Sequence, residues 1–451
     1  MHSSDFGEDF TWGVASSAYQ TEGAYLEDGK GPSIWDLFSH REKKIKDNSN
    51  GNKATSFYHR YIQDVILMDF LNIRNFRFSL SWPRLLPDGV GRKNEKGIEF
   101  YNNLIDFCLE CNIEPWVTLY HWDLPQALEE KGGWTNRDIV GWFEEYVALC
   151  IRQFGDRVKN WMVLNEPVAF TGAGYFLGLH APGKRGLQHF LPAVHHAALC
   201  QSIGARAIKS LNGALQVGTT FSCSPVDPVD KQKHSVEAAQ RADVLSNRLF
   251  AEPLLGLGYP WQELKVLQGL ERYMKPGDET LLQADLDFIG LQNYTREVVR
   301  FSTIMPYLNA RLVKASRRSV PHTDMDWEIY PEGIYRVLKR FHQYKGVKKI
   351  IITENGAAFP DKLEDGHVHD VDRISFFEQY LAQVLRAQQE GVNVAGYFAW
   401  SFTDNFEWAE GYSKRFGLVY VDYPSQRRIV KSSGFWFQHF LQNHQQLKKV
   451  V

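Results

Sequence analysis

Eight runs of apolar, often β-branched or aromatic residues recur along the chain, each followed by a polar turn and a longer amphipathic stretch. Between the runs, helical periodicity is clearest at 98–111, 137–154 and 191–212, where apolar residues recur every three or four positions. Strands that alternate with helices predict parallel pairing through right-handed crossovers. The eight runs occupy positions 10–19, 75–82, 114–121, 159–166, 215–223, 287–294, 349–354 and 394–402.

Eight such units predict an α/β fold, a single-domain (β/α)8 TIM barrel that spans residues 1–451. No Pro/Ser/Gly-rich linker, low-complexity tract or internal repeat marks a domain boundary in the sequence. The alternative is an open, doubly wound sheet, but no Gly-rich nucleotide-binding fingerprint follows the first run. In a barrel, the active site lies at the C-terminal ends of the strands, so the last residues of each run are informative.

Polar or aromatic side chains end seven of the eight runs. The fifth run ends in Ser222, Cys223 and Ser224, to which we assign no role. This pattern exceeds what packing requires, and it predicts a pocket with carboxylates at its floor, amide donors along it and indole walls. Such a pocket suits a neutral, polyhydroxylated ligand. The residues at the other seven ends are Gln20, Arg77, Trp82, His121, Trp122, Asn165, Glu166, Gln292, Asn293, Tyr294, Glu354, Asn355 and Trp400.

Two of these ends carry a glutamate in the same setting. Glu166 and Glu354 each follow an uncharged, largely apolar run, and a turn residue follows each of them. A single glutamate at a strand end is ordinarily a solvated loop residue, but two in the same architecture predict acids that face each other across a pocket. Most enzymes that cleave glycosidic bonds use such a pair of carboxyl groups, one on each side of the bond.

Composition adds to this interpretation without deciding it. Aromatic residues make up 14% of the chain, which includes 13 Trp. Flat apolar rings can stack on the faces of sugars, which favours a carbohydrate ligand. The same composition also fits a large core with aromatic fillers, and both interpretations stay open on composition alone.

Charge and cysteine content argue against other classes of protein. A net charge of −2 provides no field for binding nucleic acid or an anionic membrane. No run approaches the roughly 18 apolar residues of a membrane span, and acids stand near the N-terminus where a secretory signal would be basic and then apolar. The five scattered cysteines, including the pair at 108 and 111, are interpreted as buried free thiols. We therefore expect a cytoplasmic protein without a metal or other cofactor.

Six segments in order resemble glycoside hydrolase family 1, the β-glucosidase family, over essentially the whole chain. They read FTWGVASSAYQTEG at 10–23, RFSLSWPR at 77–84, YHWDLPQ at 120–126, LNEP at 164–167, ITENG at 352–356 and WSFTDNFEW at 400–408. The resemblance implies a retaining, exo-acting β-glucosidase that hydrolyses β-D-glucosides, and also β-galactosides or β-fucosides, through a covalent glycosyl-enzyme intermediate. Small β-glycosides and oligosaccharides are the partners that it implies.

The resemblance also implies roles for individual residues. Glu354 is expected to be the nucleophile and Glu166 the general acid/base, with Arg77 and Tyr294 orienting the nucleophile. Trp327 is expected to floor the leaving-group site. The other residues expected to bind substrate are Gln20, His121, Trp122, Asn165, Gln292, Trp400, Glu407 and Trp408.

The sequence departs from the family pattern at a few positions. Gln292 and Asn293 stand where Asn-Tyr is commoner, so contacts to the leaving group are expected to differ. Val163 replaces the usual Thr before Leu164, a packing change from which we expect little.

Two alternatives to hydrolysis remain at this point. A non-catalytic binding module on the same barrel would be expected to lack one of the two glutamates, and both are present. Transglycosylation would use the same residues, and the sequence does not separate it from hydrolysis.

Overall fold

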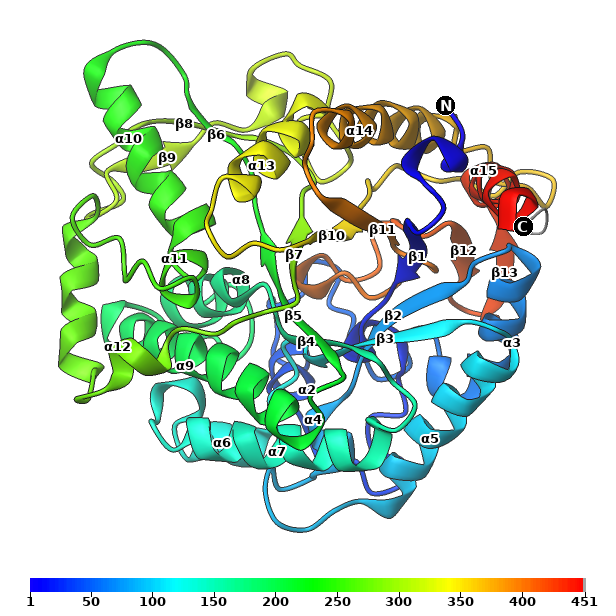
Figure 1. Cartoon of the computed structure of the whole chain (residues 1–451), viewed down its shortest axis with the longest axis horizontal. Coiled ribbons are helices and arrows are strands. Elements are labelled where there is room, and N and C mark those ends of the chain that lie inside the picture. Colours follow the sequence, from blue (N-terminus) through cyan, green and yellow to red (C-terminus); the bar gives the residue numbers. More distant parts are fainter. Residues whose placement is uncertain (449–451) are drawn as a thin grey trace.

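The computed structural model describes residues 1–448, with side chains described through residue 442. Within this range, eight parallel strands close into a barrel in the order β1-β11-β10-β7-β5-β4-β3-β2, and helices surround it (Figure 1). The predicted (β/α)8 barrel is confirmed, and the open doubly wound sheet is excluded because the first strand pairs with the last. The barrel strands are β1 Thr11–Ala15, β2 Asn75–Ser79, β3 Glu114–Tyr120, β4 Asn160–Asn165, β5 Gln216–Ser222, β7 Phe288–Gln292, β10 Ile350–Asn355 and β11 Val394–Trp400.

Each predicted run coincides with one barrel strand, but β10 extends one residue beyond its run, to Asn355, and some runs extend past their strands. The first run continues into a short helix, α1 Ala18–Thr21, and the second reaches the first residue of α4 Trp82–Leu85. Residues of both helices are buried where the loops cover the end of the barrel. Hydrophobicity alone therefore does not mark where these strands end.

Helices form the outer layer of the barrel and bury one apolar stripe each. In α5, residues Ile98, Tyr101, Leu104, Ile105 and Cys108 are buried at the spacing of one helix face. The three predicted helical stretches correspond to α5, α7 and α9. The longer helices are α3 Phe57–Phe70, α5 Glu95–Glu110, α7 Ile139–Phe154, α9 Leu187–Leu211, α13 Glu332–His342, α14 Val371–Gln389 and α15 Ser432–Lys448.

The interior of the barrel is a packed core. The rings of Trp116, Phe288 and Phe398 meet there, with Met162 beside them. Gly218 on β5 makes room for this packing, since a Cβ atom at this position would lie 2.3 Å from the ring of Phe288. Because the inside is filled, a ligand can enter only at the end of the barrel.

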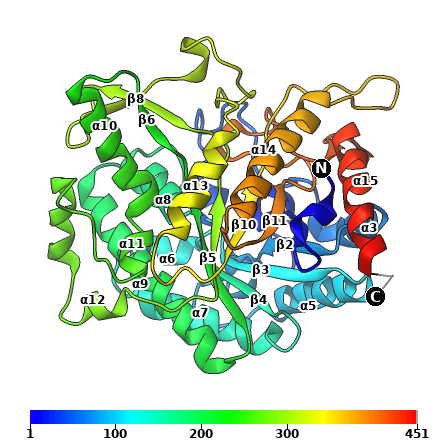
Figure 2. The same ribbon diagram turned by 45° about the horizontal axis from the view of Figure 1, so that its top comes forward.

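Two small sheets extend the loops at the ends of the strands. The first pairs β6 Val226–Pro228, β8 Glu297–Phe301 and β9 Ala310–Leu312, and α10 Lys233–Asp243 packs against it. Figures 1 and 2 show β6, β8 and α10 together at one side of the barrel. The second is a hairpin of β12 Val419–Asp422 and β13 Arg427–Val430, which follows the last barrel strand.

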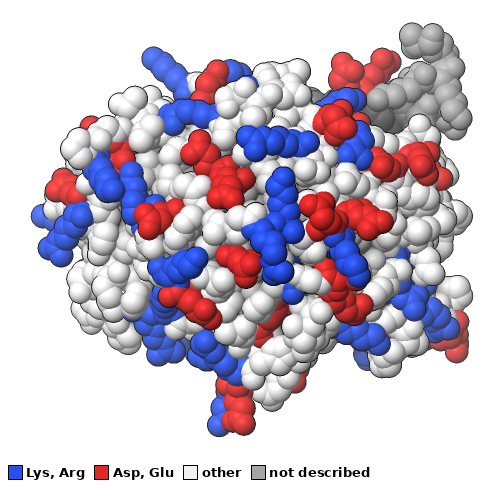
Figure 3. Space-filling view, turned by 90° about the horizontal axis from the view of Figure 1, so that it is seen from below, with Lys and Arg blue, Asp and Glu red and all other residues white. Residues whose placement is uncertain are grey.

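The predicted domain extent of 1–451 stays a prediction, and positions 449–451 lie outside the described residues. Among the described residues, no helix is both long enough and apolar enough to cross a membrane. The face in Figure 3 carries basic and acidic side chains interspersed with one another. All five cysteines lie in the described chain as free thiols. Four of them are buried, but Cys111 is partly exposed, because it lies just beyond the last turn of α5.

Candidate active site

A cavity of about 320 Å³ opens at the C-terminal ends of the barrel strands. Nine of the residues expected to act in catalysis or binding line it: Glu166, Glu354, Tyr294, His121, Trp122, Trp327, Trp400, Glu407 and Trp408. The remaining four, Gln20, Arg77, Asn165 and Gln292, are fully buried behind its wall and hydrogen-bond to one another or to lining residues. The structure thus brings all thirteen predicted residues together.

Glu354 near the end of β10 is held by two donors. The Arg77 guanidinium forms an ion pair with its Oε1, and the Tyr294 hydroxyl donates to its Oε2 at 2.6 Å. Burial raises the pKa of Glu354, but the charge of Arg77 and the hydrogen bonds from Tyr294 and Arg77 oppose that shift. These donors favour the carboxylate form of Glu354.

Glu166 stands one residue past β4 in a different environment. Burial, and then the negative charge of Glu354, raise the pKa of Glu166 to about 8, while a hydrogen bond from Ser222 and the charge of Arg77 oppose the shift. Because these two carboxyls interact, a proton shared by the pair resides on Glu166 and the negative charge on Glu354. The pair therefore consists of one acid and one anion at neutral pH.

Asn165 links this pair to the wall behind it. Its side-chain oxygen accepts hydrogen bonds from Arg77 at 2.6 Å, Gln292 at 2.8 Å and Thr220 at 2.9 Å. Three donors on one oxygen fix the orientation of the amide, so its NH₂ group points the other way. Gln292, a departure from the family pattern, thus positions Asn165 from behind the cavity wall.

The NH₂ group of the Asn165 side chain donates a hydrogen bond to His121. The amide nitrogen of Asn165 lies 3.0 Å from Nε2 of His121, so Nε2 accepts and the ring proton is on Nδ1. Burial, and then the charge of Arg77, lower the pKa of His121, which keeps the ring neutral. The His121 ring stacks on Trp400 and Trp408, with ring centroids 6.1 Å and 5.8 Å away.

Glu407 and Trp408 line the cavity next to His121 and Trp122. Nε2 of Gln20 lies 3.3 Å from the Glu407 carboxylate, and burial followed by the charges of Glu354 and Glu166 raises the pKa of Glu407 to about 8. The Trp408 ring packs on Trp122, with centroids 4.5 Å apart. Within the described chain, the Trp408 indole N–H makes no hydrogen bond, so it is free to donate into the cavity.

The backbone around the cavity is strained at three of its lining residues. Glu166, Trp122 and Trp408 have backbone φ angles of +45°, +81° and +47°. These lie in the left-handed region, which residues other than glycine rarely adopt. Gly356 allows the loop after Glu354 to pass close to β11, because a Cβ atom there would lie 1.9 Å from the carbonyl oxygen of Trp400. Surrounding contacts must hold these conformations in place.

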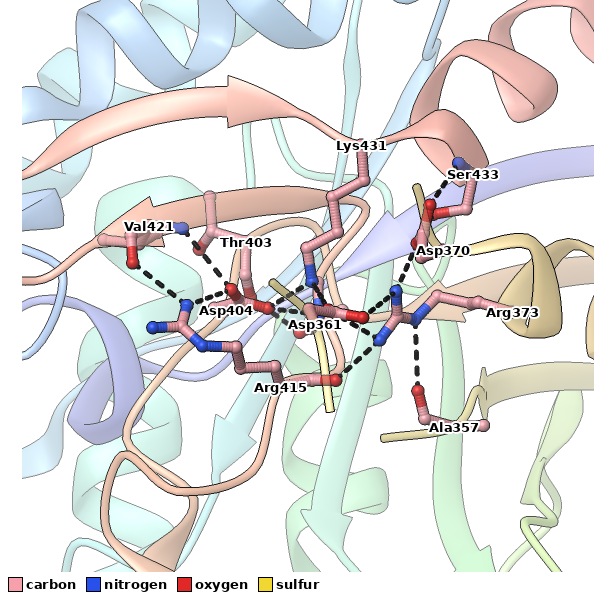
Figure 4. A network of polar contacts seen from close by, with 12 residues as sticks. Ala357, Asp361, Asp370, Arg373, Thr403, Asp404, Arg415, Val421, Lys431 and Ser433 are labelled. Atoms are coloured by element: carbon pink, nitrogen blue, oxygen red, sulfur yellow. Dashed lines mark hydrogen bonds and ion pairs between the residues drawn. The ribbon is translucent and has the colours of Figure 1, made fainter. Parts of the chain in front are cut away.

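A buried ion network supplies such contacts for the loop after β11 (Figure 4). Asp404 in this loop accepts from Lys431 at 2.6 Å and from Arg415 at 2.5 Å. Lys431 also pairs with Asp361, which Arg373 holds at 2.9 Å. Because these buried charges are paired, separating any one pair would leave a charge buried without compensation. The network therefore favours a single arrangement of the loops that carry it. The network thus ties the segment that carries Glu407 and Trp408 to the loops after β10 and β13.

The cavity also contains residues that the sequence did not predict. Ser222 is the end of the fifth run, so its position at a strand end was a usable signal. His180, Glu297, Met325 and Phe416 come from loops and added strands, whose place over the barrel no periodicity indicates. Burial lowers the pKa of His180 to about 4, so this ring is neutral. The other lining residues outside the prediction are Thr295, Ala409 and Glu410.

A closed parallel barrel with an acid and a carboxylate among indole rings at its C-terminal end defines a barrel glycosidase. Comparison with known proteins agrees with this class. The sequence profile of glycosyl hydrolase family 1 matches residues 2–446. The chain belongs to glycosyl hydrolase family 1, and it is a β-glucosidase enzyme.

Its relatives resemble it over nearly their whole length. It is 43% identical to β-glucosidase A of Thermotoga maritima, covering 98% of this chain and 99% of the relative, and 41% identical to β-glucosidase 42 of Arabidopsis thaliana, covering 99% and 96%. The solved family 1 β-glucosidase of T. maritima superposes with a TM-score of 0.93 at 42% identity, covering 97% of this chain and 98% of that one. That enzyme has also been solved in complex with glucoimidazole and with galacto-hydroximolactam.

Proposed function

We propose that this β-glucosidase is exo-acting and retaining, and that it removes β-glucosyl residues from the nonreducing end through a covalent glycosyl-enzyme intermediate. The observation that carries the proposal is the unequal pair of carboxyls. Glu354 is held as an anion by Arg77 and Tyr294, while Glu166 keeps its proton near neutral pH. Retention requires carboxyls about 5 Å apart. The Glu354 charge contributes to the raised pKa of Glu166, as expected for two carboxyls that face the same cavity.

In the first step, Glu354 attacks C1 of the glycoside and Glu166 gives its proton to the departing oxygen. The bond from C1 to the leaving group breaks as the bond from C1 to Glu354 forms. The ester at Glu354 carries no charge, so one cause of the raised pKa of Glu166 disappears. Glu166 can then take a proton from water as the water attacks C1 and releases Glu354.

The remaining residues are proposed to hold the sugar. Glu407 accepts hydrogen bonds from two neighbouring hydroxyls of the glycone, and the free indole N–H of Trp408 donates to a third. Trp327, which packs against Tyr294 and Phe416 on the other side, floors the leaving-group site. The T. maritima enzyme solved with a gluco- and with a galacto-configured ligand supports activity on β-galactosides alongside β-glucosides.

A panel of nitrophenyl glycosides tests this function. We expect β-glucoside to be cleaved, β-galactoside and β-fucoside to be cleaved with lower or comparable kcat/KM, and α-glucoside to be left intact. Proton NMR of the first product should show β-glucose before mutarotation. Initial release of α-glucose would mean inversion and would contradict the proposed intermediate.

The pH dependence follows from Glu166. Because its acid form is needed and its pKa is raised to about 8, kcat/KM should be sustained through neutral pH and fall as the pH rises above about 8. Glu407 has a pKa raised to the same value, so it could cause the same fall. Measured with dinitrophenyl β-glucoside, whose leaving group needs no proton, Glu166→Ala should lose the basic limb. A basic limb that persists in this variant would assign it to Glu407 instead.

A further inference from the structure

Glu297 lines the cavity although the mechanism gives it no role. It is the first residue of β8, in the added sheet beside the barrel, and it is partly exposed. Glu297 therefore lines the same cavity as Glu166 and Glu354, but it is carried by the small added sheet and not by a barrel strand.

No hydrogen bond or ion pair reaches the Glu297 carboxylate within the part of the chain that the structure describes. The nearby cation, Arg318, donates instead to Glu328 at 2.5 Å and to the carbonyl of Val313 at 3.2 Å. Arg296, the next residue, is occupied by the same Glu328 and by Asp227. A half-buried carboxylate without a partner raises the free energy of the folded protein. A hydrogen-bond donor on a bound molecule would lower it, because the carboxylate is free to accept.

Contacts of its neighbours place Glu297 on the same side of the cavity as Trp327. The Thr295 hydroxyl donates to the carbonyl of Glu328 at 2.9 Å, and Arg296 pairs with the Glu328 carboxylate at 2.8 Å. Because Glu328 follows Trp327 directly, the start of β8, which carries Glu297, lies beside the segment that carries Trp327. Glu297 is therefore on the side that the proposed function gives to the leaving group.

That part of the cavity has an apolar wall and a polar one. Trp327, Met325 and Phe416 form the apolar wall, with the Trp327 and Phe416 rings 6.1 Å apart. Glu297 supplies a negative group to the same cavity in which a flat ring would stack on Trp327. No Lys or Arg is among the described residues that line this cavity, so nothing there would balance an anionic leaving group.

We propose that Glu297 is a specificity residue that accepts a hydrogen bond from the leaving group, so that β-glucosides with a protonated amine there are preferred and those with a carboxylate are rejected. This inference rests on the proposed function. Neutral hydroxyl donors, as on the second sugar of a disaccharide, use the same acceptor with a smaller gain.

Four aryl β-D-glucosides of the same shape test the proposal: those with nitro, aminomethyl, hydroxymethyl and carboxyl groups at the para position. The kcat/KM of Glu297→Gln is divided by that of the unchanged enzyme for each substrate, which cancels the different leaving-group reactivities. We expect this ratio to be about tenfold below one for the aminomethyl substrate and less far below one for the hydroxymethyl substrate. For the carboxyl substrate it should be about tenfold above one. These changes correspond to one charged hydrogen bond lost or gained. The nitro value should stay within about twofold.

Glu332→Gln is the matched control, because Glu332 on α13 carries the same charge and forms an exposed ion pair with Arg386 on α14. It should leave all four values unchanged. Equal changes for all four substrates in Glu297→Gln would overturn the proposal while leaving the proposed function intact. Failure of the unchanged enzyme to hydrolyse the nitrophenyl glucoside would instead contradict the proposed function, and the nitro value also reports whether the variant is folded.

Discussion

Replacing Glu354 by Ala is expected to lower kcat for nitrophenyl β-glucoside by at least about 10⁴-fold, because no other group in the cavity is placed to attack C1. Glu166→Ala should lose less when the leaving group is activated, since the departing dinitrophenolate needs no proton. Its glycosyl-enzyme should then persist, because the base for water is missing. Added azide, which needs no base, should restore turnover and give β-glucosyl azide.

The product of the rescue distinguishes the two roles. Azide that rescues Glu354→Ala should give an α-glucosyl azide, because it replaces the missing nucleophile with a single inversion. If Glu166→Ala instead gives the α-azide and Glu354→Ala gives the β-azide, the assignments of nucleophile and acid/base are reversed. Glu332→Gln, which changes a surface carboxylate, should keep full activity and show no effect of azide.

Negligible activity on 6-phosphoglucosides is the second large effect that we expect. A phosphate on O6 would enter a cavity that contains the Glu354 anion, with no Lys or Arg among the described lining residues to balance a second negative charge. A desolvated anion beside like charges costs several kcal/mol, and about 4 kcal/mol corresponds to a factor of about 10³. The kcat/KM for nitrophenyl β-glucoside should therefore exceed that for its 6-phosphate by about 10³-fold or more.

The 6-deoxy glucoside is the neutral control in this comparison. It removes the contact to O6 without adding charge, and it also spares the desolvation of that hydroxyl. Its kcat/KM should fall much less than that of the phosphate. A ratio of glucoside to 6-phosphoglucoside near or below one would contradict the view of this cavity as a site for uncharged sugars.

Much of the barrel could be predicted from sequence because its strands are buried on both faces. Such strands read as short apolar runs, and their ends share one edge, so the amino-acid pattern alone places Glu166 and Glu354 in one site. The exact ends of the strands were less clear, since residues such as Trp82 are just as buried in the helix that follows the strand.

Features that depend on contacts between distant loops could not be predicted in this way. Gln292 was expected to contact the leaving group, but whether a side chain reaches a ligand or its neighbour Asn165 depends on geometry that one strand does not encode. The pairing of Asp404 with Lys431 joins two charged residues that look like ordinary surface positions in the sequence. Glu297 gave no signal either, because β8 lies outside the regular alternation of strands and helices.

Closure of the barrel has a consequence for the order in which the chain can fold. Thr11 pairs with Gly396, so one edge of β1 has no partner until almost the whole chain has been made. At the usual pace of translation, this interval is on the order of tens of seconds. During that time the apolar strands from β1 onward present an open sheet edge, the kind of surface on which newly made chains aggregate. Protection of the nascent chain on the ribosome is therefore a requirement that this architecture imposes on the cell that makes it.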